Sequence, residues 1–183
     1  MINVSSVSRR SVLRAALLAA APVIRGHGKI SPPQPVPDIA LVRHDGAATS
    51  LVPLVTGYAT AVQLMFTACT TTCPIQAAIF QRVQTMIQSL GDRGVQLLSL
   101  SIDPAEDTPK ALTAWRRRFH AGSDWIAAAP AMEDIPRVQE FFGKTGGADH
   151  STQVHILNRQ GRLIWRTFEL PTADEVMGIL RKV

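Results

Sequence analysis

Outside its first thirty residues the chain carries no net charge. The 183 residues have a formal charge of +5, but residues 1–30 contain five basic side chains and no acidic one. Residues 31–183 therefore contain fourteen side chains of each sign, and these cancel. Proteins that bind nucleic acid need an excess of lysine and arginine to neutralise phosphates. The balanced body indicates that nucleic acid is not a partner.

The apolar run near the N-terminus is too short to cross a membrane as a helix. It covers residues 15–24, whereas a spanning helix needs about 20 apolar residues. The basic residues before it are typical of a secretory signal, and residues 8–14 (SRRSVLR) resemble the twin-arginine export signal. A general secretory signal that contains an arginine pair is the alternative. We expect residues 1–28 to be a signal peptide and the protein to be exported to the periplasm.

The sequence contains no internal repeat and a single low-complexity tract. That tract is proline-rich, and we expect residues 29–37 to form an extended tether before a domain at 38–183. Pro22 directly follows small residues where a signal peptide is cut, and it opposes cleavage there. The leader could therefore remain as an uncleaved anchor facing the periplasm, which is the only membrane contact we expect.

Apolar runs and helical periodicities alternate along the body of the chain. The predicted elements are strands at 63–66, 95–102 and 125–129, helices at 74–90, 109–119 and 135–142, a hairpin at 152–168 and a last helix at 173–180. Strands that alternate with helices require a largely parallel sheet with helices on both faces. This order predicts an α/β domain of thioredoxin-like architecture, with a central mixed β-sheet flanked by helices.

Cysteine is scarce, and the two cysteines lie four residues apart between a strand and a helix. A helix N-terminus favours thiolate over thiol, so we expect the sulfur of Cys73, next to Pro74, to be biased toward ionisation. Cys69 and Cys73 could share a metal ion or form a reversible disulfide. A static disulfide is the third alternative, but a bond that closes so short a loop stabilises the fold little.

Three motifs resemble the Sco/SenC family in order and in spacing: residues 66–75 (FTACTTTCPI), 101–109 (SIDPAEDTP) and 149–151 (DHS). The resemblance covers residues 38–183. It implies a thioredoxin fold that binds copper through Cys69, Cys73 and His150. It also implies a role in assembly of the copper A centre of cytochrome c oxidase, by carrying copper or by reducing the target's cysteines.

One part of the first motif departs from the family pattern. Many members have an aromatic or other bulky residue before the first cysteine and an aspartate after it, where this chain has Ala68 and threonines at 70–72. The departure bears on the identity of the partner more than on the copper ligands.

Two thiolates and one imidazole form a soft, three-coordinate ligand set. Cu(I) favours thiolates, and Cu(II) accepts imidazole with a fourth ligand, whereas zinc is the main competitor for such a site. His150 lies in a loop without proline, where thioredoxin-like oxidoreductases usually have a cis-proline. This favours a ligand, with a surface-loop histidine as the alternative. Asp149 could orient the imidazole.

The remaining candidates are given structural interpretations. We expect Asp107 or Thr108 to cap a helix, with support of the site as the alternative role of Asp107. We expect Asp103 either to form a turn or to support the site. We expect residues 116–118, three arginines, to form a solvated helix face. We assign no metal role to the other histidines, which are His27, His44, His120 and His155. His155 lies in the predicted strand at 152–157, and we expect its role to be structural.

The function that these residues favour is a copper-binding metallochaperone rather than an enzyme. Its partner is expected to be a copper-receiving protein, such as a cytochrome oxidase subunit with a copper A domain. The alternative is a thiol-disulfide reductase that uses Cys69 and Cys73 as a redox-active pair. A copper or redox sensor would use the same residues, and a peroxidase would leave the histidine motif unexplained.

Overall fold

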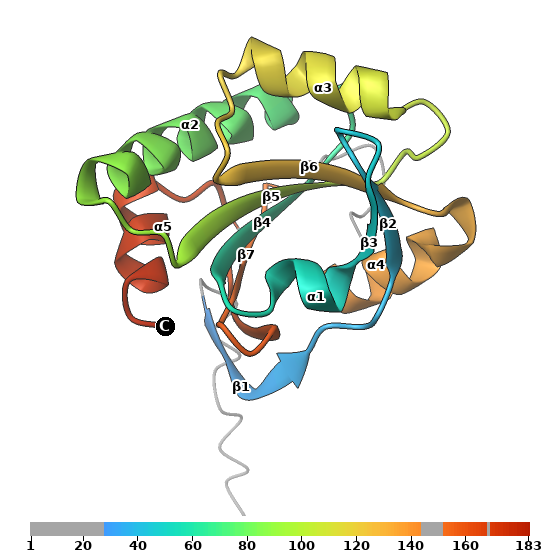
Figure 1. The fold of residues 1–183 in the computed structure, drawn as a ribbon. Helices are drawn as coiled ribbons and strands as arrows, with labels where there is room; N and C mark the ends of the chain where they lie inside the picture. The colour runs from blue at the N-terminus through green and yellow to red at the C-terminus, as the bar shows by residue number, and fades with distance from the viewer. Residues whose placement is uncertain (1–27, 144–151, 168) are drawn as a thin grey trace, which may run out of the picture.

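The computed structural model describes residues 28–143, 152–167 and 169–183. In this part of the chain a single β-sheet runs through the middle of the fold, with helices on both sides (Figure 1). Its strands are β1 (Gly28–Pro35), β2 (Ala40–Arg43), β3 (Ala48–Ser50), β4 (Ala59–Met65), β5 (Val95–Ser101), β6 (Trp125–Pro130), β7 (Val154–Leu157) and β8 (Arg162–Arg166). The helices are α1 (Leu51–Val55), α2 (Thr72–Leu90), α3 (Pro109–Arg118), α4 (Ile135–Phe142) and α5 (Ala173–Leu180), with a short 3-10 helix, η1 (Met132–Asp134).

The sheet is mixed, and its strands are ordered β1-β8-β7-β4-β5-β6-β2-β3. The central strands β4, β5 and β6 run parallel, and antiparallel strands extend the sheet on both sides. Every residue of β4 and β5 is buried, because helices cover both faces of these strands. The predicted α/β class with a central mixed sheet flanked by helices is confirmed.

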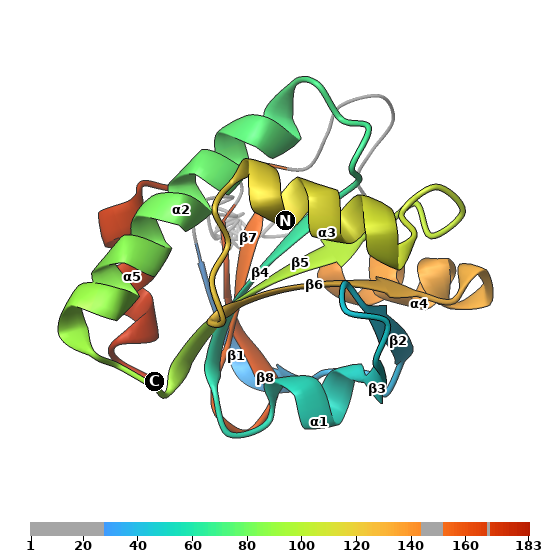
Figure 2. The same ribbon diagram turned by 45° about the horizontal axis from the view of Figure 1, so that its top comes forward.

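The helices form two layers, one on each face of the sheet (Figure 2). Successive strand residues face opposite sides. Ala61 and Leu97 therefore belong to the hydrophobic cluster under α2, α3 and α5, whereas Val62 and Leu98 belong to the cluster that includes α1 and α4. Both cysteines lie in the first cluster, so the candidate site is anchored in the core beneath α2.

Helix boundaries follow the local signals in the sequence. α2 ends at Gly91, which adopts the left-handed conformation with φ 63°. The Thr108 side chain accepts a hydrogen bond from the Ala111 N–H at the start of α3. Thr172 and Glu175 form the predicted capping box of α5.

The proline-rich segment is extended, as expected for a tether, but it is also part of the sheet. β1 pairs antiparallel with β8, with Gly28 opposite Arg166 and Lys29 opposite Trp165. The chain therefore enters the fold beside β8. The predicted signal peptide lies almost wholly outside the described residues, and no helix among those described is long and apolar enough to cross a membrane.

Candidate functional site

The two cysteines meet where β4 passes into α2. Cys69 lies in the connecting loop and Cys73 in the first turn of α2, and the Cys73 backbone N–H donates a hydrogen bond to Cys69 Sγ at 3.4 Å. Both thiols are free and nearly covered, with exposed fractions of 4% and 3%. The neighbouring residues Ala68 and Thr70 are exposed. The helix N-terminus therefore acts on Cys69.

The two thiols have different pKa values because their surroundings differ. Burial, followed by the hydrogen bond with Cys69, raises the pKa of Cys73 to about 12. Burial opposes ionisation of Cys69 as well, but hydrogen bonds from Cys73 and Thr71 outweigh it and lower the pKa of Cys69. The expectation that Cys73 is the ionised sulfur is wrong. The reason is that its own N–H points at Cys69, while its side chain enters the core.

A buried carboxylate fixes the start of the cysteine loop. Asp107 is 1% exposed, and its Oδ1 accepts hydrogen bonds from the Thr67 backbone N–H at 2.9 Å and from the Thr67 hydroxyl. Its Oδ2 accepts from the Ser101 hydroxyl at 2.6 Å. Of the two expected cap residues, Thr108 is the N-cap of α3 and Asp107 is not. The Asp107 side chain instead ties the second motif, residues 101–109, to the loop that carries Cys69.

The turn interpretation of Asp103 agrees with the structure. Its carbonyl oxygen accepts from the Asp107 N–H at 2.9 Å, and its own N–H donates to the Ser101 hydroxyl at 3.0 Å. The turn brings Asp107 back toward the end of β5, where Ser101 lies. Asp103 thus acts through its backbone, and Asp107 acts through its side chain.

Gln76 links the cysteine helix to β7. It lies one turn after Cys73, is fully buried, and its Nε2 donates to the Gln153 carbonyl oxygen at 2.7 Å. Gln153 precedes β7 directly and follows His150 by three residues. A polar residue at an apolar position of the helical pattern is the signal that could have identified Gln76 from the sequence.

His150 and Asp149 lie outside the described residues. Among the residues that are described, no three His, Cys, Asp or Glu side chains form a group that could hold a metal ion. The structure therefore brings together two of the three predicted ligands, and the third stays a prediction.

The other histidines in the described part have structural surroundings. His155 in β7 is fully buried, its ring lies 5.0 Å from that of Phe142, and neither ring nitrogen has a hydrogen-bond partner among the described residues. Burial, with a smaller contribution from Arg166, lowers the pKa of His155 to about 3. Its predicted structural role is supported. His44 Nδ1 lies 3.2 Å from the Ala127 carbonyl oxygen, and His120 is exposed at the end of α3.

The arginine run of α3 is only partly solvated. Arg117 and Arg118 are exposed, but Arg116 is half-buried and donates from Nε to the Trp125 carbonyl oxygen at 2.9 Å and from Nη2 to the Gly122 carbonyl oxygen. The expected solvated face is therefore wrong for Arg116, which bridges α3 and the start of β6.

Comparison with known proteins identifies the family. The family model described as SCO1/SenC matches residues 31–183, which is most of the chain, and the protein belongs to this family. A search of curated proteins finds no match.

Solved structures share the fold at low sequence identity. A SCO1/SenC family lipoprotein from Bacillus anthracis is 22% identical, with a TM-score of 0.71 over 84% of this chain and 98% of that one. Copper-bound ScoI from Bradyrhizobium japonicum is 20% identical, with a TM-score of 0.67 over 81% and 98%. BsSco, a member of the Sco family of cytochrome c oxidase assembly proteins in which a disulfide switch was identified, is 18% identical, with a TM-score of 0.71 over 85% and 96%. The predicted thioredoxin-like architecture is confirmed by this likeness.

Proposed function

We propose that this SCO1/SenC family member is an exported, copper-binding metallochaperone whose ligands are Cys69, Cys73 and His150. Copper is the cargo, and its recipient is an exported copper protein such as a cytochrome oxidase subunit with a copper A domain. Copper-bound ScoI from Bradyrhizobium japonicum supports the choice of metal. The family's association with cytochrome c oxidase assembly, stated for BsSco, supports the choice of recipient.

The observation that carries the proposal is the preformed sulfur pair. The hydrogen bond from the Cys73 N–H to Cys69 Sγ holds the first sulfur at the helix N-terminus. Asp107 fixes Thr67, two residues before Cys69. Thiolates are the donors that Cu(I) selects, and a loop held at both ends loses little freedom when the ion binds.

Chain connectivity supports His150 as the third ligand. Consecutive Cα atoms are 3.8 Å apart, so a segment of three residues before Gln153 reaches at most about 11 Å from its Cα. Gln153 is hydrogen-bonded to Gln76, which lies one helical turn from Cys73. Gln153, directly before β7, is thus tied to α2, the helix that begins at the cysteines. An imidazole three residues earlier in the chain has the reach to meet the two sulfurs.

Transfer by this site requires ligand exchange and no change in oxidation state. An incoming thiolate of the recipient binds Cu(I) as one chaperone sulfur leaves. Cys69 lies in the loop with exposed neighbours, and its lower pKa stabilises it as a free thiolate after departure. Cys73, whose pKa is about 12, leaves only by regaining a proton. We therefore assign Cys69 as the sulfur that exchanges first.

The test is metal binding by the reduced full chain under anaerobic conditions. Wild type should bind one copper ion, measured by mass spectrometry of metal content, in preference to zinc. Cys69→Ser and Cys73→Ser should each abolish stable binding. His150→Ala should weaken Cu(II) binding far more than it slows thiol-disulfide exchange, with His44→Ala as the matched control. Unchanged copper affinity in His150→Ala would remove the imidazole from the ligand set.

The unequal acidity of the two thiols favours a second function, thiol-disulfide reduction. The Cys69 thiolate attacks a disulfide of the partner and forms a mixed disulfide, releasing one partner thiolate. Cys73 then loses its proton and attacks Cys69, so the chain ends as the Cys69–Cys73 disulfide and the partner as a dithiol. Mixing copper-loaded protein with a soluble copper A domain separates the two: copper movement supports delivery, and new partner thiols without copper movement support reduction.

A further inference from the structure

The helix that begins at the cysteines carries a row of apolar side chains outside its buried face. The row follows helical spacing along α2 and consists of Ile75, Ile79, Arg82, Met86 and Leu90. Residues three or four positions apart share one face of a helix. Ile75 and Leu90, the two ends of the row, are 53% and 54% exposed, and Ile79 and Met86 are half-buried. The apolar surface of α2 is therefore wider than the part that the core covers.

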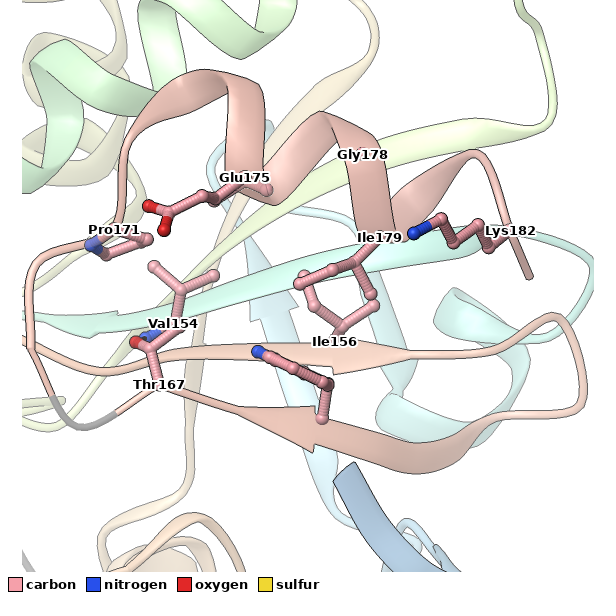
Figure 3. A pocket seen from close by; sticks show the side chains of 10 residues that line it. Val154, Ile156, Thr167, Pro171, Glu175, Gly178, Ile179 and Lys182 are labelled. Atoms are coloured by element: carbon pink, nitrogen blue, oxygen red, sulfur yellow. Dashed lines mark hydrogen bonds between the residues drawn. The ribbon is translucent and has the colours of Figure 1, made fainter. Parts of the chain in front are cut away.

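A groove of about 620 Å³ lies between α2 and α5, which pack side by side on the same face of the sheet (Figure 1, Figure 2). Ile79 and Met86 line it from α2, and Pro171 and Ala173 line it at the start of α5. Figure 3 shows Pro171 at this end of α5, whereas Ile179 lines a separate pocket against β7. The row on α2 therefore continues into a concave, largely apolar surface.

This surface begins beside the cysteine loop. Ile75 follows Cys73 by two residues, and Ile79 lies one helical turn further along α2. Ligand exchange requires a thiolate of the recipient on the same copper ion as Cys69, so the recipient must contact the surface around this loop. A standard interface buries about 800 Å² on each partner and is about 28 Å across. An interface centred on the loop therefore reaches Ile75 and Ile79.

The charges at the groove cancel. Arg82 lies on the α2 side and Asp174 on the α5 side, and both are exposed. Neither forms an ion pair with any residue that the structure describes. One charge of each sign gives no preference for an acidic or a basic partner. Burial of apolar surface is the remaining driving force, and salt does not screen it as it screens exposed charges.

We propose that the groove between α2 and α5, together with Ile75, is the docking surface for the protein that receives the copper. The recipient presents an uncharged, apolar segment next to its copper-binding thiolates, and this segment lies against Ile75, Ile79 and Met86. The inference rests on the proposed metallochaperone function and names the surface that holds the partner while the ligands exchange.

Nuclear magnetic resonance of the reduced full chain, titrated with a metal-free soluble copper A domain, tests docking without copper transfer. The methyl signals of Ile75 and Ile79 should shift in a saturable way. The signal of Ile39, which is fully buried on the opposite face of the sheet, should stay in place as the internal control. Unmoved Ile75 and Ile79 signals overturn the proposal.

Two other occupants of the groove have their own signatures in the chain without the copper A domain. Ile75 and Ile79 signals that move on dilution of the chain would assign the groove to a second copy. Nuclear Overhauser contacts between Ile79 and the apolar run at residues 15–24 would assign it to the chain's own leader. Either result overturns the proposal.

Ile75→Gln and Leu90→Gln form a matched pair, because both change a half-exposed aliphatic residue of α2 and only Ile75 lies beside the cysteines. Ile75→Gln should lower the rate constant of copper transfer to the copper A domain about tenfold with unchanged copper stoichiometry, and Leu90→Gln should stay within about twofold of wild type. Equal rates in the two variants overturn the proposal.

The salt dependence of transfer checks the chemistry assigned to the partner. Raising the salt concentration from about 0.05 M to about 0.5 M should change the wild-type rate constant less than about twofold. A fall of about tenfold or more would mean that charges guide docking, and it would overturn the apolar groove.

The docking surface and the delivery function fail separately in these experiments. Copper transfer by wild type that Ile75→Gln leaves unchanged removes the docking surface and keeps delivery. Saturable shifts of Ile75 and Ile79 without any copper movement remove delivery and keep the docking surface.

Discussion

Replacing Asp107 with alanine removes the acceptor for three donors, two on Thr67 and one on Ser101. A hydrogen bond to a charged group contributes about 1.5–3 kcal/mol, but removing the carboxylate also removes the cost of burying it. We therefore expect the free energy of unfolding to fall by about 3 kcal/mol. Asp107→Asn keeps an oxygen for Thr67 and loses the charge, so its loss should be about 1 kcal/mol.

The same substitution should weaken copper binding, because Thr67 lies two residues before Cys69. Loss of a group that supports a metal ligand typically lowers metal affinity by about 10–100-fold. Asp107→Ala should fall in this range and Asp107→Asn near its lower limit. Urea unfolding followed by circular dichroism measures the stability, and an anaerobic competition titration with a Cu(I) chelator measures the affinity.

Asp103→Ala is the matched control, because the Asp103 carboxylate makes no hydrogen bond in the described part of the chain. Its stability should stay within about 0.5 kcal/mol of wild type. If Asp107→Ala unfolds at the same urea midpoint as wild type, the carboxylate does not anchor the loop. If stability falls but copper affinity is unchanged, the anchor serves the fold alone.

Three further predictions follow from the described contacts. Iodoacetamide should modify Cys69 before Cys73 at neutral pH, because only the pKa of Cys69 is lowered. Peptide mass spectrometry measures the order of modification. Faster modification of Cys73 contradicts the assignment of Cys69 as the more acidic thiol. His155 has a folded pKa of about 3, below its unfolded value of 6.5, so stability should be unaffected above pH 6.5 and fall by about 1.4 kcal/mol per unit as pH decreases toward 3. His155→Leu should flatten this slope in acid urea titrations, and an unchanged slope would assign it to other groups. Gln76→Leu should weaken Cu(II) binding more than Cu(I) binding, because it releases Gln153 but neither sulfur. Paramagnetic resonance measures the first and chelator competition the second. Equal losses would mean that the Gln76–Gln153 hydrogen bond only holds α2 against the sheet.

Local patterns in the sequence are sufficient for the elements that their own residues determine. The apolar runs predict β5 and β6, and the cap residues predict the ends of α2, α3 and α5, because each signal acts within a few residues. β4 is longer than predicted, since its first residues, Ala59 to Ala61, are too small to mark a buried strand. The sequence does not predict β1, β2 and β3, which lie at the two ends of the sheet. β1 pairs with β8 and β2 pairs with β6, both far along the chain, and β3 has only three residues.

The site shows the same limit. The positions of Cys69 and Cys73 follow from the strand–loop–helix pattern. The role of Asp107 does not, because its partner Thr67 is forty residues away along the chain. Nor does the pattern decide which sulfur is ionised: that depends on the direction of one N–H and on how deeply Cys73 enters the core, and both are properties of the assembled fold.

The charge state of the pair connects the two functions proposed for it. With the pKa of Cys73 near 12, the metal-free site at neutral pH contains a protonated Cys73 beside a sulfur that ionises more readily, which is the resting state of a dithiol reductant. A metal ion must displace the Cys73 proton before both sulfurs can act as ligands, because thiolates and not thiols bind metals. Under the two proposed functions, copper binding converts a reducing pair into a metal centre, and the loss of copper restores the reducing pair. Since the same proton is released in both reactions, burial of Cys73 governs how readily the site passes from one function to the other.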